Sequence, residues 1–522
     1  MFLALASSAG AADEPAIVSI TAKPDRLLFE FAAAAGQRVR LVELRPYETY
    51  TAENATPAEW EGPACAHSLE LRRFKDGRDR LFSKWQLAHA ESGRPYGRPQ
   101  YATDFTELPE RNKPFSWPKS IKGLQSVVDV DDAIKLGVKH VAHNVLISQV
   151  LDLSGSTDAE HWTVDGEKIA IDGGYIGHLD KTIEALTAAG VNVTIILLNA
   201  VPTKPDAGNP LIHPSTDLAA APNHLGAFNL TDERGLRHYR AAVEFLADRY
   251  SDPTGKHGSV SGYIIGNELQ AHWWWYNIGT STPQAVISDY ARAVRIAHLA
   301  ARKIHSGIRT YVSLDHHWTA RMTDDRRKFI PGKELLDGLH SLITSEGNFD
   351  WHVAQHPYPE NLFDPRTWDD RDATLDFDTK KITFKNIEIL AQYLAQPQWH
   401  ASGSPRRIIL SEQGFHSPEG EQGERLQAAA YAYAYYRARH VDGIDAFILH
   451  RHVDHQHEGG LRLGVRARKE NTVTTPGRKK FLYDVFQRAD SQDWQDVFEF
   501  AKPIIGIDDW SELLPRTVTS KK

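Results

Sequence analysis

The chain has 522 residues with a formal net charge of -8 at pH 7, and 41% of its residues are hydrophobic and 25% charged. This profile is typical of a folded globular protein and leaves room for a barrel of roughly 250 residues or more beside an accessory domain. The acidic balance and the lack of long basic runs argue against a nucleic-acid or membrane-surface partner, and the single cysteine, Cys65, excludes an intrachain disulfide or a cysteine metal cluster.

The first residues have features of a secretion signal. Residues 1–12 are apolar at their centre and end in small residues, although the basic start of such signals is missing. We expect residues 1–14 to be a signal remnant or a tail and the protein to be secreted or periplasmic, with a cytoplasmic location left open. No apolar run reaches the roughly 20 residues that a membrane-spanning helix needs.

Alternating apolar and polar residues follow. Leu27, Phe29 and Phe31 are spaced by two, as are Val39 and Leu41, and turns rich in Pro, Gly and Asp separate such segments. A period of two is typical of strands that bury one face. The sequence therefore predicts an antiparallel β-sandwich accessory domain over residues 15–110.

Beyond a proline-rich connector, short apolar runs alternate with amphipathic helices. The helical period of 3.6 is clear where Leu236, Tyr239 and Val243 share a face. Eight candidate strands lie at residues 123–128, 140–147, 192–199, 262–268, 308–314, 350–355, 407–412 and 444–450. Because parallel neighbours need crossover connections, this alternation predicts a (β/α)8 TIM barrel over residues 111–522.

Several connections after the predicted strands are long. Residues 201–229, 357–383 and 451–475 exceed the usual few residues of such loops, and residues 162–170 are expected to form a hairpin that turns at Asp165-Gly166. The carboxyl ends of barrel strands carry the chemistry of this fold. We expect these loops to wall a cleft there.

Two glutamates stand at the ends of predicted strands. The fourth strand ends in Asn267-Glu268, ahead of a loop with three consecutive tryptophans, and the seventh ends in Glu412. Across one barrel mouth, two carboxyl groups can lie about 5–5.5 Å apart, as in retaining glycosidases, or roughly 6.5–9.5 Å apart, as in inverting ones. Two like charges at close range also push one pKa up, so one carboxyl can be an acid while the other stays ionised.

These residues resemble the strand ends of the clan A glycoside hydrolases, (β/α)8 retaining glycosidases with Asn-Glu on strand four and a nucleophilic Glu on strand seven. The resemblance covers roughly residues 122–488. It is closest to a little-characterised bacterial family of the clan in which a tryptophan-rich loop also follows Asn-Glu. It implies that Glu268 is the general acid and base, Glu412 the nucleophile and Asn267 a donor to the sugar 2-hydroxyl.

The resemblance extends to strand six and stops at strand eight. His356-Pro357-Tyr358 is similar to the clan's His-x-Tyr, in which the tyrosine supports the nucleophile. A tryptophan is usual at the end of strand eight, whereas this chain has Leu-His-Arg-His at residues 449–452. The usual sugar platform is therefore missing, and Trp275 and Trp318 are the candidate rings to stack on a sugar.

Histidines collect at the predicted strand ends, and their role has three readings. His316, His450 and His452 could be ordinary hydrogen-bonding groups, or, on strand eight, ligands of a metal-dependent hydrolase. With Arg451, the strand-eight histidines could instead contact an acidic or sulfated glycan. Asp315, at the end of strand five, is a reserve carboxylate beside a helix-cap or loop-anchor role.

The reading that these observations favour is a retaining glycoside hydrolase. It acts on O-glycosidic bonds of a poly- or oligosaccharide through Glu268 and Glu412 and needs no cofactor or metal. The alternatives are a barrel that binds glycans without cleaving them and the metal-dependent hydrolase. Cleavage of a glycan distinguishes the retaining hydrolase from the binding protein. Loss of activity on chelation identifies the metal-dependent hydrolase.

Overall fold

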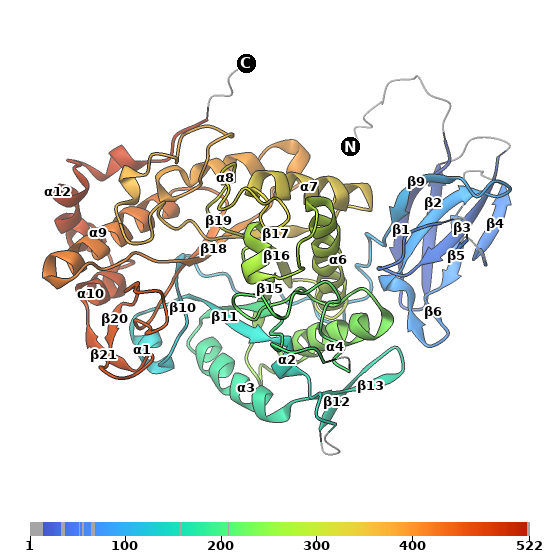
Figure 1. Ribbon diagram of the computed structural model, residues 1–522, viewed down its shortest axis with the longest axis horizontal. Helices are drawn as coiled ribbons and strands as arrows, with labels where there is room; N and C mark the ends of the chain where they lie inside the picture. Colours follow the sequence, from blue (N-terminus) through green and yellow to red (C-terminus); the bar gives the residue numbers. More distant parts are fainter. Residues whose placement is uncertain are drawn as a thin grey trace. The chain divides into compact units, whose positions relative to one another are not determined.

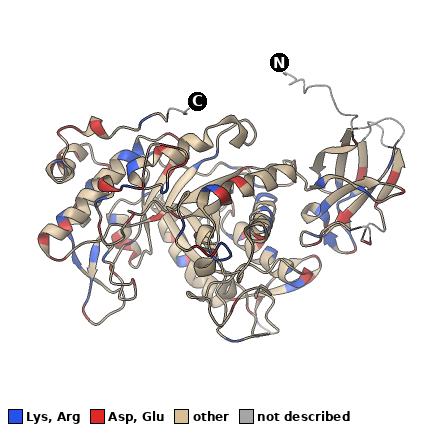
Figure 2. Ribbon diagram, turned by 45° about the horizontal axis from the view of Figure 1, so that its top comes forward, with Lys and Arg blue, Asp and Glu red and all other residues tan. Residues whose placement is uncertain are grey.

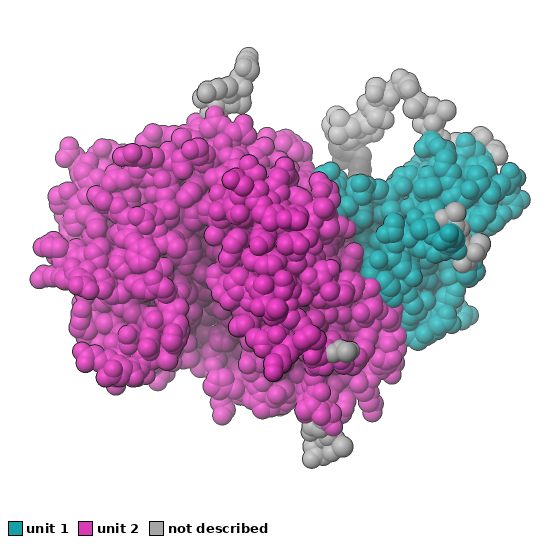
Figure 3. All heavy atoms as spheres, viewed as in Figure 1, with its two compact units in different colours: residues 1–110, 341–349 teal, residues 111–340, 350–522 magenta. Residues whose placement is uncertain are grey.

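The computed structural model describes residues 14–32, 37–51, 53–54, 57–63, 68–155, 159–206 and 208–518 (Figure 1). The chain divides into two compact units, one of residues 1–110 and 341–349 and the other of residues 111–340 and 350–522 (Figure 3). The expected signal remnant or tail lies outside the described residues, apart from Glu14. Within the described residues, no helix has the length and apolar character to cross a membrane.

The first unit is built from two antiparallel sheets, which confirms the predicted β-sandwich. One sheet has the order β1 (Ala16–Ala22), β2 (Arg26–Ala32), β5 (Ser68–Arg72). The other has the order β4 (Trp60–Pro63), β3 (Arg38–Leu44), β8 (Lys84–His89), β9 (Pro95–Gln100). A small hairpin joins β6 (Phe74–Lys75) to β7 (Arg78–Asp79). The alternating residues Leu27, Phe29 and Leu41 are fully buried. The apolar residues spaced by two therefore lie on the face of each strand that packs into the core.

The second unit contains a closed barrel of eight parallel strands (Figure 1). In barrel order they are β10 (Lys122–Gln125), β11 (His140–Leu146), β14 (Asn192–Leu198), β15 (Val260–Ile265), β16 (Arg309–Leu314), β17 (Trp351–Gln355), β18 (Ile408–Gln413) and β19 (Ile444–Leu449). The last strand pairs with the first and closes the ring. Each predicted strand is present with bounds shifted by a few residues, so the predicted TIM barrel is confirmed.

Helices connect the barrel strands, and further helices follow the last strand. The longer ones are α1 (Val130–Lys135), α3 (Gly173–Ala188), α4 (Glu233–Arg249), α6 (Pro283–Arg302), α7 (Gly332–Ser345), α8 (Glu388–Leu394), α9 (Gly420–Arg439) and α10 (Phe481–Arg488). Short helices are α2 (Ile147–Val150), α5 (His272–Trp275), α11 (Trp494–Phe498) and α12 (Lys502–Ile505). Figure 2 shows positive and negative residues interspersed over the helices and loops. This mixture suits a solvated outer layer.

Two hairpins extend the loops of the second unit. The predicted one joins β12 (Glu160–Val164) to β13 (Glu167–Ile171), and the other joins β20 (Arg466–Arg468) to β21 (Pro476–Lys479). The predicted turn residues Asp165 and Gly166 have φ of 51° and 82°. Both therefore adopt the left-handed conformation that a tight two-residue hairpin turn requires.

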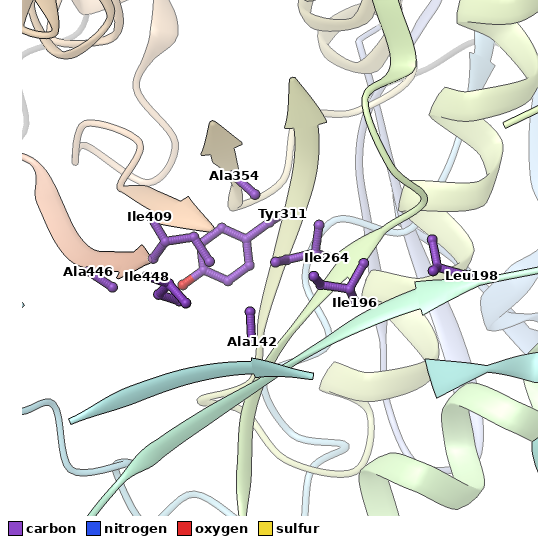
Figure 4. Packing of buried hydrophobic residues seen from close by; sticks show 9 residues of the cluster. All are labelled: Ala142, Ile196, Leu198, Ile264, Tyr311, Ala354, Ile409, Ala446 and Ile448. Carbon is purple, nitrogen blue, oxygen red and sulfur yellow. The ribbon is translucent and has the colours of Figure 1, made fainter. Parts of the chain in front are cut away.

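The barrel interior is filled by side chains from the strands. Nine of them pack as one buried cluster, namely Ala142, Ile196, Leu198, Ile264, Tyr311, Ala354, Ile409, Ala446 and Ile448. Figure 4 shows the Tyr311 ring among Ile264, Ile409 and Ile448, and the small alanines leave room for it. Since this core closes the barrel, a ligand site must lie beyond it, at the strand ends.

Candidate active site

Glu268 lies just beyond the end of β15 in an uncommon backbone conformation. Its φ of 42° and ψ of 62° fall in the left-handed region, which a glutamate rarely adopts. Gly266, two residues earlier, has φ of 70°, and a Cβ there would lie 2.9 Å from a ring carbon of Tyr276. The backbone N–H of Glu268 donates to Oγ of Ser313 on β16 at 2.9 Å. Strand five thus holds the turn that presents Glu268, and such conformations cluster at functional sites.

Glu412 lies on β18, where the pairing with β19 shifts register between Leu410 and Gln413. Both of its carboxylate oxygens accept a hydrogen bond. The Tyr358 hydroxyl donates to Oε1 at 3.1 Å, and Nε2 of Gln125 donates to Oε2 at 2.9 Å. Strand one and the loop after strand six therefore fix the orientation of this carboxylate.

The structure brings the two glutamates together. One carboxylate oxygen of Glu268, one of Glu412 and one ring nitrogen of His356 all lie within 4.8 Å of one another. This upper limit for the nearer oxygens is compatible with the roughly 5–5.5 Å carboxyl separation of a retaining pair, which is shorter than the roughly 6.5–9.5 Å of an inverting pair. A glycosidic carbon placed here could be reached by both carboxyl groups.

The surroundings shift the pKa values of the two carboxyl groups in opposite directions. Burial raises the pKa of Glu268 above its ordinary value and outweighs the hydrogen bond and the charge of His356, which lower it; the charges of Asp315 and Glu412 add smaller increases. Burial also acts to raise the pKa of Glu412, but the charges of His450 and His356 and its two hydrogen bonds lower it overall. Glu268 is therefore poised as an acid while Glu412 stays ionised.

His356 joins the two halves of the site. The residue is 0% exposed and follows β17. Its Nδ1 lies 2.9 Å from Oε1 of Glu268, and its Nε2 lies 3.1 Å from Oγ of Ser411, next to Glu412. Burial acts to lower the pKa of His356, but the hydrogen bond to Glu268 and the charge of Glu412 raise it overall. The buried ring thus lies between the two acids, which favour its charged form.

Asn267 is available to a ligand. The residue is 9% exposed, and its carboxamide makes no hydrogen bond to any residue that the structure describes. Asp315, in contrast, is engaged by its own loop: the His317 backbone N–H donates to Oδ1 at 2.7 Å, and Nδ1 of His317 lies 3.0 Å from Oδ2. The reserve carboxylate is therefore a loop anchor that adds negative charge near Glu268.

The basic side chains after strand eight all have carboxylate partners. His452 is 0% exposed, with Nε2 2.9 Å from Oδ2 of Asp132. His450 and Arg451 share Glu458, whose Oε1 lies 3.1 Å from Nε2 of His450 and whose Oε2 accepts from Arg451. His452 is thus packed behind the site, and Glu458 offsets the positive charge that was expected to meet an acidic sugar.

The candidate stacking residues lie in different environments. Trp318 is 2% exposed, donates Nε1–H to the Phe377 carbonyl at 2.8 Å and packs edge-on against Tyr393. This interior position leaves it no face for a sugar. Trp275 is half-buried on α5 and keeps a partly open ring. His316 is stacked on its neighbouring histidine, and burial lowers its pKa to about 3, so it is neutral.

Four polar residues of the site were not singled out from the sequence: Gln125, Ser313, Ser411 and Glu458. Gln125 is the last residue of β10, and this position at a strand end could have identified it. The two serines lie inside strands, and Glu458 lies in a loop of mixed polarity. No motif distinguishes these three, since their role depends on residues that only the closed barrel brings near.

Glu268, His356 and Glu412 are also close enough to share a metal ion. In the structure, Nδ1 of His356 lies against Glu268 and Nε2 against Ser411. Within the described part of the chain, no such group includes a strand-eight histidine. The metal-dependent reading therefore finds no ligand set around His450 and His452 there.

Comparisons with known proteins give one family and a set of distant folds. The model of a family of unknown function matches residues 114–513. A sequence search of curated proteins finds no match. At 10–14% identity the similar structures carry no conclusion about the reaction. Three of the similar solved structures are named as glycosidases.

The first is a family 39 glycoside hydrolase from the gut symbiont Bacteroides cellulosilyticus WH2, with 12% identity, a TM-score of 0.43 and coverage of 92% of this chain and 80% of that chain. The second is a beta-glycosidase from Pyrococcus horikoshii, with 10% identity, a TM-score of 0.44 and coverage of 76% and 99%. The third is a monomeric beta-xylosidase from Caulobacter crescentus CB15, with 14% identity, a TM-score of 0.41 and coverage of 73% and 70%.

Proposed function

The chain belongs to DUF5722, a family of unknown function, and we propose that it is a retaining glycoside hydrolase of clan A that cleaves O-glycosidic bonds in an oligo- or polysaccharide. One observation carries this proposal. A carboxylate oxygen of Glu268 and one of Glu412 lie within 4.8 Å of each other. Two carboxyl groups at this separation, one neutral and one ionised, are what double displacement at an anomeric carbon requires.

In the first step, Glu412 attacks the anomeric carbon while Glu268 gives its proton to the leaving oxygen. The glycosidic bond breaks, and a glycosyl ester forms on Glu412. In the second step, the ionised Glu268 takes a proton from water as the water oxygen attacks the same carbon, and Glu412 leaves as a carboxylate. The sugar is released with retained configuration, and Glu268 is again protonated.

Burial makes this exchange of roles effective. His356, in contact with Glu268, is 0% exposed, so little water screens the charges between the two acids. When Glu268 gives up its proton, the His356 cation at 2.9 Å stabilises the carboxylate that remains. Asn267 would donate to the sugar 2-hydroxyl, a contact that strengthens in the transition state of this reaction class.

We propose a neutral glycan as the substrate, in place of the acidic or sulfated glycan expected from the strand-eight cations. Glu458 pairs with both His450 and Arg451, and His452 pairs with Asp132. Since His450 and Arg451 share a carboxylate and burial lowers the pKa of His452, little free positive charge remains for a sulfate or uronate. The composition of residues 1–12 supports action outside the cytoplasm.

The test is a screen of plant and algal polysaccharides and aryl glycosides for released sugar, with sulfated and uronate-containing glycans as a separate arm. Glu412→Gly should lose turnover, and azide should restore it on an activated aryl glycoside and give a glycosyl azide of inverted configuration. Glu419→Ala, on an exposed side chain seven residues away, is the matched control. An active Glu412→Gly without azide, or glycan binding without any cleavage, would remove the proposal.

A further inference from the structure

A line of hydrogen bonds leads from Glu412 to the loop after β19. The Gln125 carboxamide donates Nε2–H to Oε2 of Glu412 at 2.9 Å and accepts at Oε1 from Nδ1 of His450 at 2.9 Å. On the other side of the ring, Nε2 of His450 lies 3.1 Å from Oε1 of Glu458. Gln125 is 2% exposed and His450 7%, so solvent screens this line little.

The direction of each bond follows from what the groups can do. The ionised Glu412 can only accept, so Gln125 must turn its NH₂ toward it and its carbonyl toward His450. Nδ1 of His450 therefore carries a hydrogen. Nε2 faces Glu458, a second acceptor, and carries a hydrogen as well. Both ring nitrogens therefore face oxygen acceptors, which is the arrangement that a doubly protonated imidazolium requires.

Glu458 keeps that charge in place. Burial acts to raise its pKa, but the hydrogen bond and charge of His450 and the charge of Arg451 outweigh it and lower the pKa to about 2. The ionised groups around His450 are therefore Glu458 and Arg451, with Glu412 beyond Gln125. His455 also faces this cluster, with Nδ1 4.0 Å from Oε2 of Glu458.

We propose that His450 is a positioning residue that acts through the Gln125 carboxamide to orient Glu412 and to keep it ionised for attack. This inference rests on the proposed function. The carboxamide separates the cation from the nucleophile, so His450 adds favourable charge without being able to hand Glu412 a proton directly. A cation in direct contact would bind the attacking oxygen more strongly and blunt it. The residue at the end of strand eight thus serves the nucleophile instead of the sugar.

The test is a carboxyl titration that needs no substrate. ¹³C NMR of glutamate-labelled protein follows Glu412, assigned by its loss in Glu412→Gln. We expect its titration midpoint to rise by about one pH unit or more in His450→Gln and to stay unchanged in His457→Gln, an exposed neighbour of the same loop. Gln125→Met should raise the midpoint too, and adding His450→Gln to it should change little further.

The outcomes separate this inference from the proposed function. If an aryl glycoside is cleaved, the acid limb of the kcat/KM profile should shift in His450→Gln by as many pH units as the titration midpoint of Glu412. If the protein cleaves glycosides but neither His450→Gln nor Gln125→Met moves the titration midpoint of Glu412, the inference alone is overturned. A shifted midpoint in a protein that cleaves no glycoside overturns the proposed function alone. Fully additive shifts in the double variant would show that the two residues act separately and would also overturn the inference.

Discussion

The Tyr358 hydroxyl donates to Oε1 of Glu412 across 3.1 Å. Burial, with the charges of Glu412 and Glu268, raises the pKa of Tyr358 well above its ordinary value, so the phenol remains a neutral donor. The opposite oxygen of Glu412 accepts from Gln125. The carboxylate is thus held from both sides, and its plane is set before any substrate arrives.

Replacing Tyr358 by Phe should therefore slow the reaction without disturbing the fold. A hydrogen bond to a charged group contributes about 1.5–3 kcal/mol, so we expect kcat/KM to fall by roughly 10- to 100-fold. Tyr250→Phe is the control, because it removes another tyrosine–carboxylate bond, to Asp180, from the helical layer. Equal losses of activity in the two variants would contradict a specific role for Tyr358.

The opposite pKa shifts of the two acids predict a bell-shaped dependence of kcat/KM on pH. Attack needs Glu412 ionised, and its lowered pKa puts the loss of activity on acidification below the ordinary glutamate range. Protonation of the leaving group needs neutral Glu268, and its raised pKa puts the alkaline loss above that range. A single acid limb with no alkaline decline would show that Glu268 is not the acid.

His356→Gln should move both limbs of this profile to higher pH. His356 lowers the pKa of Glu268 by its hydrogen bond and charge, and its charge lowers that of Glu412. Removing the cation takes away both effects, and we expect shifts of about half to one pH unit. His352→Gln lies at the other end of β17 and should leave the limbs where they are. Limbs that move to lower pH would contradict the assigned role of His356.

Much of this arrangement could be predicted from the sequence, and the reason is local. Apolar runs mark strands wherever they lie in a fold, and a polar residue that closes such a run marks the mouth of a barrel, as Glu268 and Glu412 do. Partners across the barrel are different. Gln125 contacts Glu412 from 287 residues away and His450 from 325, and no local pattern encodes such pairing.

The orientation of loop side chains could not be predicted either. Trp318 and His452 each follow a predicted strand as closely as the residues that do reach the site, yet both are bound to other segments. Their direction depends on partners from other segments, the Phe377 carbonyl for Trp318 and Asp132 for His452. A rule based on strand ends therefore locates the site but also selects residues that do not belong to it.

Asp132 should be central to the stability of the second unit. It accepts from Arg466 at 2.6 and 2.9 Å and from Tyr483 at 2.7 Å, and it faces His452. These contacts join α1 to the segments after β19. Asp132→Ala leaves buried donors unpaired and should cost about 3–5 kcal/mol, seen as a lower midpoint of thermal unfolding. Asp131→Ala, exposed on the same helix, should change it little.

The same group predicts a pH dependence of stability. Burial acts to raise the pKa of Asp132, but its bonds to Arg466, His452 and Tyr483 outweigh this and lower the pKa strongly. A carboxylate with a lowered folded-state pKa stabilises the fold above its unfolded value, and that contribution is lost as the pH falls toward the folded value. The difference in unfolding free energy between wild type and Asp132→Ala should therefore shrink below about pH 4. A difference that grows on acidification would contradict this assignment.

Asn267 tests the link between the site and a sugar. Its carboxamide has no hydrogen-bond partner among the described residues, so Asn267→Ala should leave the unfolding midpoint unchanged. If the carboxamide binds the 2-hydroxyl, a contact worth several kcal/mol in the transition state, kcat/KM should fall by about a hundredfold or more on ordinary aryl glycosides. A 2-deoxy glycoside lacks that hydroxyl and should lose little. Comparable losses on both substrates would mean that Asn267 acts on Glu268 or the backbone, because only a contact with the missing group can depend on its presence.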